Sequence, residues 1–234
     1  MKDEDGRPDK SRRIPRATLY LLLTLGILSA SLWFFVTLTN HVAGNAPHVT
    51  EAMIMRGLRT PGDLSIPVGP HWLKMVCLDI TALGSGTVLA LVTALVAGYL
   101  LLERQFRSAG LVLFATITGA FWSNFLKHII NRDRPQIVPH LAEVSGQSYP
   151  SGHSMLSAIV YLTLAVVLIQ TASSRSTKIY IVSVAVFITL LVGMTRVYIG
   201  VHYPTDVLAG WLAGSIWAVL CWLLASRFQR KETT

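Results

Sequence analysis

The sequence predicts an all-α, polytopic membrane protein in which six transmembrane helices form one bundle. The chain has 234 residues, of which 52% are hydrophobic and 14% charged, whereas about a quarter of the residues in an ordinary soluble domain are charged. Six stretches contain no Lys, Arg, Asp or Glu and are long enough to span, or nearly span, a bilayer, which takes about 20 residues. A soluble helical core is the alternative, but six such stretches in one chain favour the membrane.

The first apolar stretch is interpreted as a retained anchor. A basic segment precedes it, as in a signal peptide, but its 23 residues are too many for a signal h-region, and Asn40–Gly44 is a poor cleavage site. The third and fifth stretches are short for a span, and each ends in a basic residue, Lys127 or Arg196, that could snorkel to the interface. The six predicted spans are Ala17–Thr39, Ala82–Leu102, Ala109–Leu126, Ser154–Ser174, Ile179–Thr195 and Val207–Ser226.

Charged segments at the two chain ends are predicted to lie outside the membrane. Residues 1–16 are charged and contain a proline, a composition typical of a disordered tail. Residues 227–234 form the second tail, so the six-helix membrane domain is expected to cover residues 17–226.

The first long outer connection, residues 41–81, is predicted to contain a short amphipathic helix. Four apolar residues fit one face of such a helix, which could lie in the headgroup region. The alternative is a connector that only caps the bundle. The four residues are Val49, Met53, Ile54 and Leu58.

The net charge of +8 reflects membrane topology rather than nucleic-acid binding. If the N-terminus is cytoplasmic, thirteen basic residues lie inside and seven lie outside or at the outer boundary, which is the positive-inside bias. Four of those seven lie in or beside the motifs described next: Lys127, Arg132, Arg134 and Arg196. Both termini are therefore expected in the cytoplasm, and the basic tail, compact loops and short length favour a bacterial inner (plasma) membrane.

Three short motifs lie near the ends of apolar segments. They are Lys127-x6-Arg134-Pro135, Pro150-Ser151-Gly152-His153 and Thr195-Arg196-x5-His202-x3-Asp206. With a cytoplasmic N-terminus, spans three and five end outside, and spans four and six begin outside. The alternation of the chain therefore predicts that all three motifs meet at the outer, periplasmic face.

These residue types can bind a phosphoryl group. A helix that begins at Ser151-Gly152 offers free backbone N–H groups to an anion, and Gly152 allows the backbone to approach it closely. Lys127, Arg134 and Arg196 add positive charge, and the arginines can bind oxygens bidentately. Each cation alone could be an interfacial anchor, but three without matching acids favour an anionic ligand.

Two histidines in different environments suggest two chemical roles. Asp206 lies four residues after His202 and can reach its ring if a helix starts near Tyr203-Pro204, which fixes the tautomer and leaves a nucleophilic nitrogen. His153 has no such partner in sequence and suits proton donation to a leaving oxygen.

No carboxylate cluster suggests a metal site, so the predicted phosphoryl transfer needs neither metal nor cofactor. The acidic residues near the motifs are Asp133, Glu143 and Asp206. The positive pocket would stabilise charge where other enzymes use a metal ion.

The three motifs resemble those of the type 2 phosphatidic acid phosphatase family of integral membrane lipid phosphatases. Its pattern is Lys-x6-Arg-Pro, Pro-Ser-Gly-His and Ser-Arg-x5-His-x3-Asp; the first two match fully, and Thr195 stands where the family has Ser. The resemblance implies a six-helix bundle that hydrolyses lipid phosphate esters or anhydrides through a phosphohistidine. It makes His202 the nucleophile, Asp206 its orienting partner and His153 the general acid. The phosphate-binding residues would be Lys127, Arg134, Ser151, Gly152 and Arg196.

Three other functions would use a similar basic pocket: an anion transporter or channel, a vanadate-dependent oxidase, and a phosphatase for soluble substrates. The expected partners are a lipid phosphate substrate and membrane lipids, without nucleic acid, and the oligomeric state is open. Phosphatidate, phosphatidylglycerol phosphate, undecaprenyl diphosphate and lipid A phosphates share the same headgroup chemistry, so the sequence does not choose among them.

Overall fold

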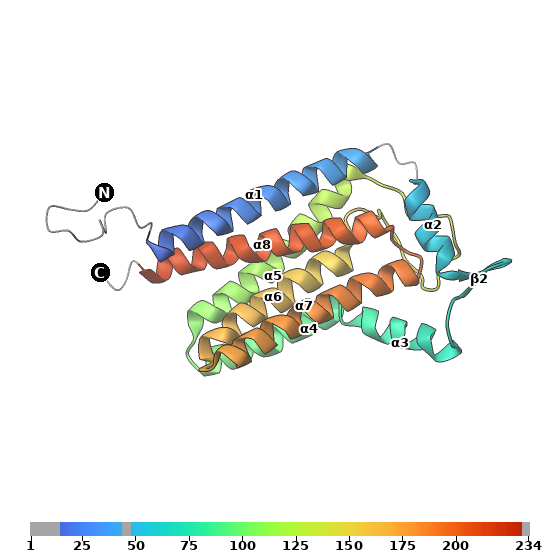
Figure 1. Cartoon of the computed structure of the whole chain (residues 1–234). Helices are drawn as coiled ribbons and strands as arrows, with labels where there is room; N and C mark the ends of the chain where they lie inside the picture. Colours follow the sequence, from blue (N-terminus) through green and yellow to red (C-terminus); the bar gives the residue numbers. More distant parts are fainter. Residues whose placement is uncertain (1–14, 44–47, 231–234) are drawn as a thin grey trace, which may run out of the picture.

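The computed structural model describes residues 15–43 and 48–230, so most of the two predicted tails lies outside the described residues. Within them the chain forms eight helices and one short antiparallel hairpin. In chain order (Figure 1) the elements are α1 (Arg16–Val42), α2 (Val49–Gly57), β1 (Arg59–Thr60), β2 (Asp63–Pro67), α3 (His71–Ala82), α4 (Gly86–Leu102), α5 (Phe106–Ile130), α6 (Gly152–Thr171), α7 (Arg175–Tyr198) and α8 (Pro204–Arg230).

The described helices confirm an all-α, polytopic membrane architecture. Five of them are long and apolar enough to cross a bilayer, and α3 with α4 forms a sixth candidate that is bent by 48°. The third and fifth spans are longer than their uncharged stretches, because α5 has 25 residues and α7 has 24. Their basic ends, Lys127 and Arg196, lie inside the last helical turns instead of ending the helices.

The second predicted span differs from the structure at its start. The helix stops after Ala82 and resumes at Gly86, where the Ser85 hydroxyl caps α4 by accepting from the N–H of Val88. Gly84 lies in this break, and a Cβ there would lie 2.3 Å from Cγ1 of Val192 on α7. Hydropathy alone does not record backbone direction, and the signal for the break is the turn-forming run Gly84-Ser85-Gly86.

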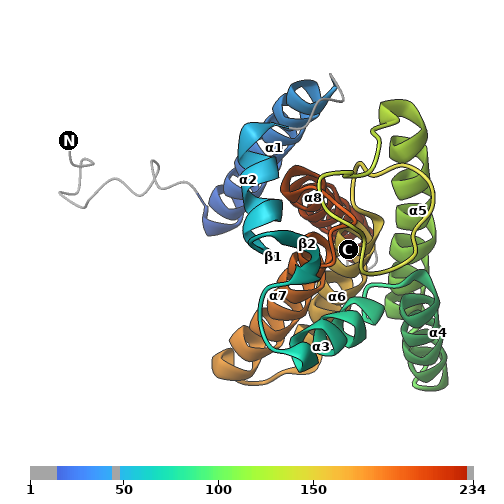
Figure 2. The same cartoon turned by 90° about the vertical axis from the view of Figure 1, so that its right-hand side faces the viewer.

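Helix α6 lies at the centre of the bundle, packed against α4, α5, α7 and α8 (Figure 2). Close contact with α8 depends on glycines: a Cβ at Gly210 would lie 2.7 Å from the carbonyl of Ser151, and one at Gly214 would lie 2.4 Å from the carbonyl of Met155. The pair Gly210-x3-Gly214 therefore makes a contact within the chain. It also brings the start of α8 beside the start of α6.

The helix ends that carry the motifs gather at one end of the bundle. There the connection between α5 and α6 lies near α2 and the hairpin, whereas α1 begins and α8 ends at the opposite end (Figure 1). This arrangement agrees with the predicted convergence of the three motifs.

The predicted amphipathic helix is present as α2, but the apolar face that was predicted for it points mostly outward. Val49 and Met53 are 77% and 69% exposed, whereas Glu51 and Met55 are buried. An outward apolar face fits the predicted contact with headgroups, and that contact stays a prediction. The hairpin and α3, which follow α2, were not predicted.

Candidate active site

A buried histidine, serine and aspartate form the centre of the site. His202 and Asp206 are 2% and 0% exposed, and Nδ1 of His202 lies 3.5 Å from Oδ2 of Asp206. The hydroxyl of Ser148 lies between them, 3.1 Å from Nδ1, and donates to Oδ2 at 2.5 Å. Helix α8 begins at Pro204, so the carboxylate is in its first turn, as the spacing predicted.

This arrangement determines the tautomer of His202. A serine hydroxyl has one proton, and Ser148 donates it to Asp206, so its oxygen accepts from Nδ1–H of the imidazole. Burial lowers the pKa of His202 to about 4, although Asp206 raises it. The ring is therefore neutral at pH 7, and Nε2 keeps a lone pair.

The lone pair of His202 faces a cation. Nη1 of Arg134 lies 3.4 Å from Nε2 of His202, and the guanidinium also donates to the carbonyls of Val201, Ser145 and Gly146 at 2.9–3.0 Å. Burial lowers the pKa of Arg134, but an arginine remains charged at neutral pH. A phosphoryl group bound by Arg134 would therefore lie beside the nucleophilic nitrogen.

The start of α6 offers a second anion-binding element. The side chain of Ser151 caps the helix by accepting from the N–H of Ser154, while the N–H of Ser151 donates to the carbonyl of Asp206. The N–H groups of Gly152 and His153 have no protein acceptor among the described residues. A Cβ at Gly152 would lie 3.5 Å or more from its neighbours, so packing does not require glycine here, and close approach of a ligand is a better reason for it.

Two further predicted cations surround the same space. The Cε atom of Lys127 is the neighbour 3.5 Å from that position at Gly152, and its Nζ donates to the carbonyl of Gln147 at 2.8 Å. Arg196 is 4% exposed and donates to the hydroxyl of Thr81 on α3 at 3.0 Å. Its buried Nε has no acceptor among the described residues, an unfavourable state that an anion would relieve.

His153 occupies the second position of α6, directly after Gly152. Its backbone and Cβ pack against Gly84 at the break between α3 and α4. Neither ring nitrogen hydrogen-bonds to another described residue, so both are available to a ligand. The bend that sequence analysis missed therefore contributes to the wall of the site.

Three residues not foreseen as part of the site join the predicted set directly or, for Glu51, through Arg132. Ser148 precedes the second motif by two positions, Arg132 donates to Asp206 at 2.7 Å, and Glu51 of α2 accepts from Arg132 at 2.8 Å. The acidic residues near the motifs therefore include Glu51, which corrects the sequence-based inventory. The only signals were the position of Arg132 inside the first motif, between Lys127 and Arg134, and a lone acid on the amphipathic helix.

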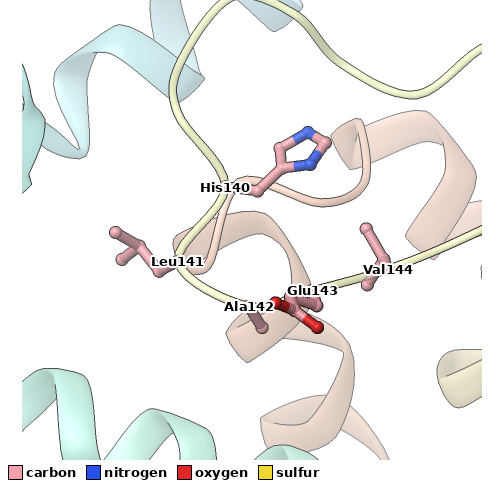
Figure 3. Close-up of a pocket in the computed structure, with 5 residues that line it drawn as sticks. All are labelled: His140, Leu141, Ala142, Glu143 and Val144. Atoms are coloured by element: carbon pink, nitrogen blue, oxygen red, sulfur yellow. The ribbon is translucent and has the colours of Figure 1, made fainter.

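A hollow of about 580 Å³ lies beside the site, on the connection between α5 and α6. Residues 140–144 line it. Figure 3 shows the imidazole of His140 and the carboxylate of Glu143 on this stretch. The next two residues, Ser145 and Gly146, hold Arg134 through their carbonyls. In the described part of the chain, no group of three or more His, Cys, Asp or Glu side chains could hold a metal ion.

Comparisons with known proteins point to one family. A model described as the PAP2 superfamily matches residues 108–230, a range that contains all three motifs. Phosphatidylglycerophosphatase B of Bacillus subtilis (strain 168) is 31% identical over 201 residues, covering 85% of this chain and 92% of that protein. Lipid A 1-phosphatase of Rhizobium etli is 28% identical over 150 residues, covering 56% and 60%.

A solved structure has the same fold. The crystal structure of a transmembrane PAP2-type phosphatidylglycerolphosphate phosphatase from Bacillus subtilis matches with a TM-score of 0.77 and 29% identity. The match covers 86% of this chain and 96% of that one.

Proposed function

This chain belongs to the PAP2 superfamily of phosphatases, and we propose that it hydrolyses a lipid phosphate monoester or diphosphate through a phosphohistidine on His202. One observation carries this proposal: Nε2 of His202 faces Arg134 while Nδ1 is held by Ser148 and Asp206. An anion transporter would need the cations but not this orientation of an imidazole. Phosphatidate, phosphatidylglycerol phosphate, undecaprenyl diphosphate and lipid A phosphates are all candidate substrates.

In the first step, Nε2 of His202 attacks phosphorus and the bond from phosphorus to the leaving oxygen breaks, which releases the lipid alcohol from a monoester or the lipid phosphate from a diphosphate. Lys127, Arg134, Arg196 and the first N–H groups of α6 stabilise the charge on the phosphoryl oxygens. His153 donates a proton to the leaving lipid oxygen. The negative charge of the bound phosphate favours the protonated form of the His153 ring.

In the second step, water attacks the phosphohistidine. Deprotonated His153 accepts a proton from the water, the bond between phosphorus and Nε2 breaks, and inorganic phosphate leaves. Asp206 and Ser148 hold the Nδ1–H throughout, so the ring returns to its starting tautomer.

An apolar hollow supports a lipid rather than a soluble substrate. It has a volume of about 310 Å³ and lies between α4, α5 and α6, lined in part by Leu89, Ile117 and Leu156. Leu156 follows Gly152 by four positions, about 6 Å along the helix. A phosphate at the start of α6 would therefore leave its acyl or prenyl chain beside this hollow.

The substrate class is tested by comparing a long-chain lipid phosphate in mixed micelles with a short-chain analogue below its micellar concentration. We expect a kcat/KM at least about tenfold higher for the long-chain lipid, because local concentration and orientation favour it. Phosphate release by the purified protein is the measurement. Equal efficiency on the soluble analogue would favour a soluble-substrate phosphatase, and no release from any member of a lipid panel would overturn the function.

We also propose that the reaction needs no metal ion, because three cations surround the phosphate position. A strong chelator is expected to leave the rate of phosphate release within about twofold of its value without chelator. Loss of activity that magnesium restores would contradict metal-independent transfer.

The site is proposed to face the periplasm, with both termini in the cytoplasm of a bacterial inner membrane. Glu143→Cys, in a background without Cys77 and Cys221, is expected to react with an impermeant thiol reagent on spheroplasts. The matched control is Glu103→Cys, at the opposite end of the bundle, which should react only after permeabilisation. The reverse pattern of labelling would reverse the topology.

A further inference from the structure

A buried ion network connects α2 to the carboxylate of Asp206. Arg132 is 0% exposed and donates to both acids, through Nη2 to Oε2 of Glu51 at 2.8 Å and through Nη1 to Oδ1 of Asp206 at 2.7 Å. Nη1 also donates to the hydroxyl of Thr205 at 2.8 Å, and that hydroxyl donates to Oε1 of Glu51. The guanidinium carbon lies 4.1 Å from the centre of the Tyr203 ring, so Arg132 is fixed by contacts on several sides.

We propose that Arg132 and Glu51 form a positioning pair for the phosphoryl-transfer reaction. Arg132 orients the Asp206 carboxylate toward His202, and Glu51 compensates the charge of Arg132. This role depends on the proposed function, because it acts on the step that begins at His202.

The orienting role follows from how the Asp206 carboxylate is occupied. Oδ1 accepts from Arg132, whereas Oδ2 accepts from Ser148 and from the N–H of Tyr203 and lies 3.5 Å from His202. The arginine therefore holds the oxygen that does not face the imidazole. Without it, one oxygen of a fully buried carboxylate would lack its donor, and the group could rotate away from the geometry that His202 requires.

The role of Glu51 follows from charge. Arg132 and Asp206 alone would form a neutral pair, and the imidazole would lie beside little net charge. With Glu51 added, the three buried side chains carry one net negative charge. Positive charge develops on the ring of His202 as Nε2 bonds to phosphorus, and that negative charge stabilises it.

Glu51 is itself held at the start of α2, where its Oε2 also accepts from the N–H of His48 at 3.2 Å. The first outer connection is thereby part of the catalytic apparatus rather than only a cap on the bundle. The pair should alter the rate of chemistry and leave binding of the lipid unchanged.

Three variants test the pair: Arg132→Met, Glu51→Gln and the double variant. Arg132→Met is expected to lower kcat about a hundredfold and Glu51→Gln about tenfold, with KM within about twofold of the parent in both. The double variant should have a kcat at or below that of Arg132→Met, because it lacks both the donor to Asp206 and the negative charge of Glu51. Its melting temperature should nevertheless exceed that of Arg132→Met, because no unpaired acid remains buried at position 51.

Arg59→Met is the matched control for the loss of a buried arginine. Arg59 is 2% exposed and donates to the carbonyls of Leu58, Tyr198 and Pro139, without contact to Asp206. It is expected to lower the melting temperature while keeping kcat within about threefold of the parent. If Arg132→Met does not fold, Arg132→Lys is the second variant. It keeps the charge without the planar guanidinium that donates to both acids, and it should lower kcat about tenfold at unchanged KM.

Some outcomes would contradict the positioning role alone, and one would overturn the proposed function. The positioning role is wrong if kcat of the double variant returns to the parental value, if an Arg132 variant raises KM without lowering kcat, or if Arg59→Met lowers kcat as much as Arg132→Met. It is also wrong if the folded Arg132 variants keep parental kcat. A parent protein that releases no phosphate from any lipid would instead overturn the proposed function.

Discussion

His202→Ala is expected to abolish phosphate release, with kcat lowered by about 10⁴-fold or more. The variant removes Nε2, the one nitrogen in the site whose lone pair faces Arg134 while its ring is held by Ser148 and Asp206. Without a nucleophile, the cations would still bind the phosphate, so KM for residual activity should change little. The measurement is phosphate release by purified protein in detergent, with the melting temperature as a check on folding.

His71→Ala is the matched control for loss of an imidazole at the same end of the bundle. His71 begins α3 and is exposed, so this variant should keep parental kcat. Near-normal turnover by a folded His202→Ala variant would show that another group attacks phosphorus.

His153→Gln is expected to lower the rate of the first step, transfer of the phosphoryl group to His202, by an amount that depends on the leaving group. For an alkyl phosphate such as phosphatidate, the departing alkoxide needs a proton, and loss of the general acid should cost about 10²- to 10⁴-fold. In a diphosphate of a similar lipid, the leaving group is the lipid monophosphate, which is stable as an anion. Cleavage of the diphosphate should therefore suffer much less. The measurement is the ratio of the two rates of lipid-product release in a single turnover, in parent and variant, because phosphate release also includes the second step, which both substrates share.

A uniform loss of this first-step rate on both substrates would contradict proton donation by His153 to the leaving oxygen. It would instead suit a role in binding the phosphoryl group, since binding is common to the monoester and the diphosphate. In that case KM should rise for both substrates as well.

The sequence predicted most of the bundle and the convergence of the motifs, because both depend on local patterns. Uncharged stretches indicate spans, and alternation of spans puts the ends of the third and fifth beside the starts of the fourth and sixth. The spacing of His202 and Asp206 is likewise local, since His202 lies two positions before α8 and Asp206 lies in its first turn.

The remaining parts of the site depend on contacts between distant residues. Glu51 and Arg132 are 81 positions apart, and Arg196 reaches Thr81 across 115 positions. Nothing in the spacing of either pair predicts the contact. The bend at Gly84 was missed for a related reason, because Val192 and His153 create the need for glycine there.

The predicted pairing of His202 with Asp206 did not include Ser148. From sequence, a serine two positions before Pro150 is interpreted as an ordinary loop residue. The folded connection between α5 and α6 brings its hydroxyl between His202 and Asp206. The structure thus brings His202 and Asp206 together and adds Ser148 to their hydrogen bonding.

The most direct measurement of the central claim is to identify the residue that carries phosphate during turnover. Parent protein and His153→Gln should be mixed with a lipid diphosphate labelled in its terminal phosphate and quenched rapidly, since the variant should hydrolyse the intermediate slowly. We expect an acid-labile, base-stable phosphoryl group on the peptide that contains His202, and none in His202→Ala. Label on a different residue, or turnover by the parent with no label on His202 in either protein, would contradict a phosphohistidine at this position.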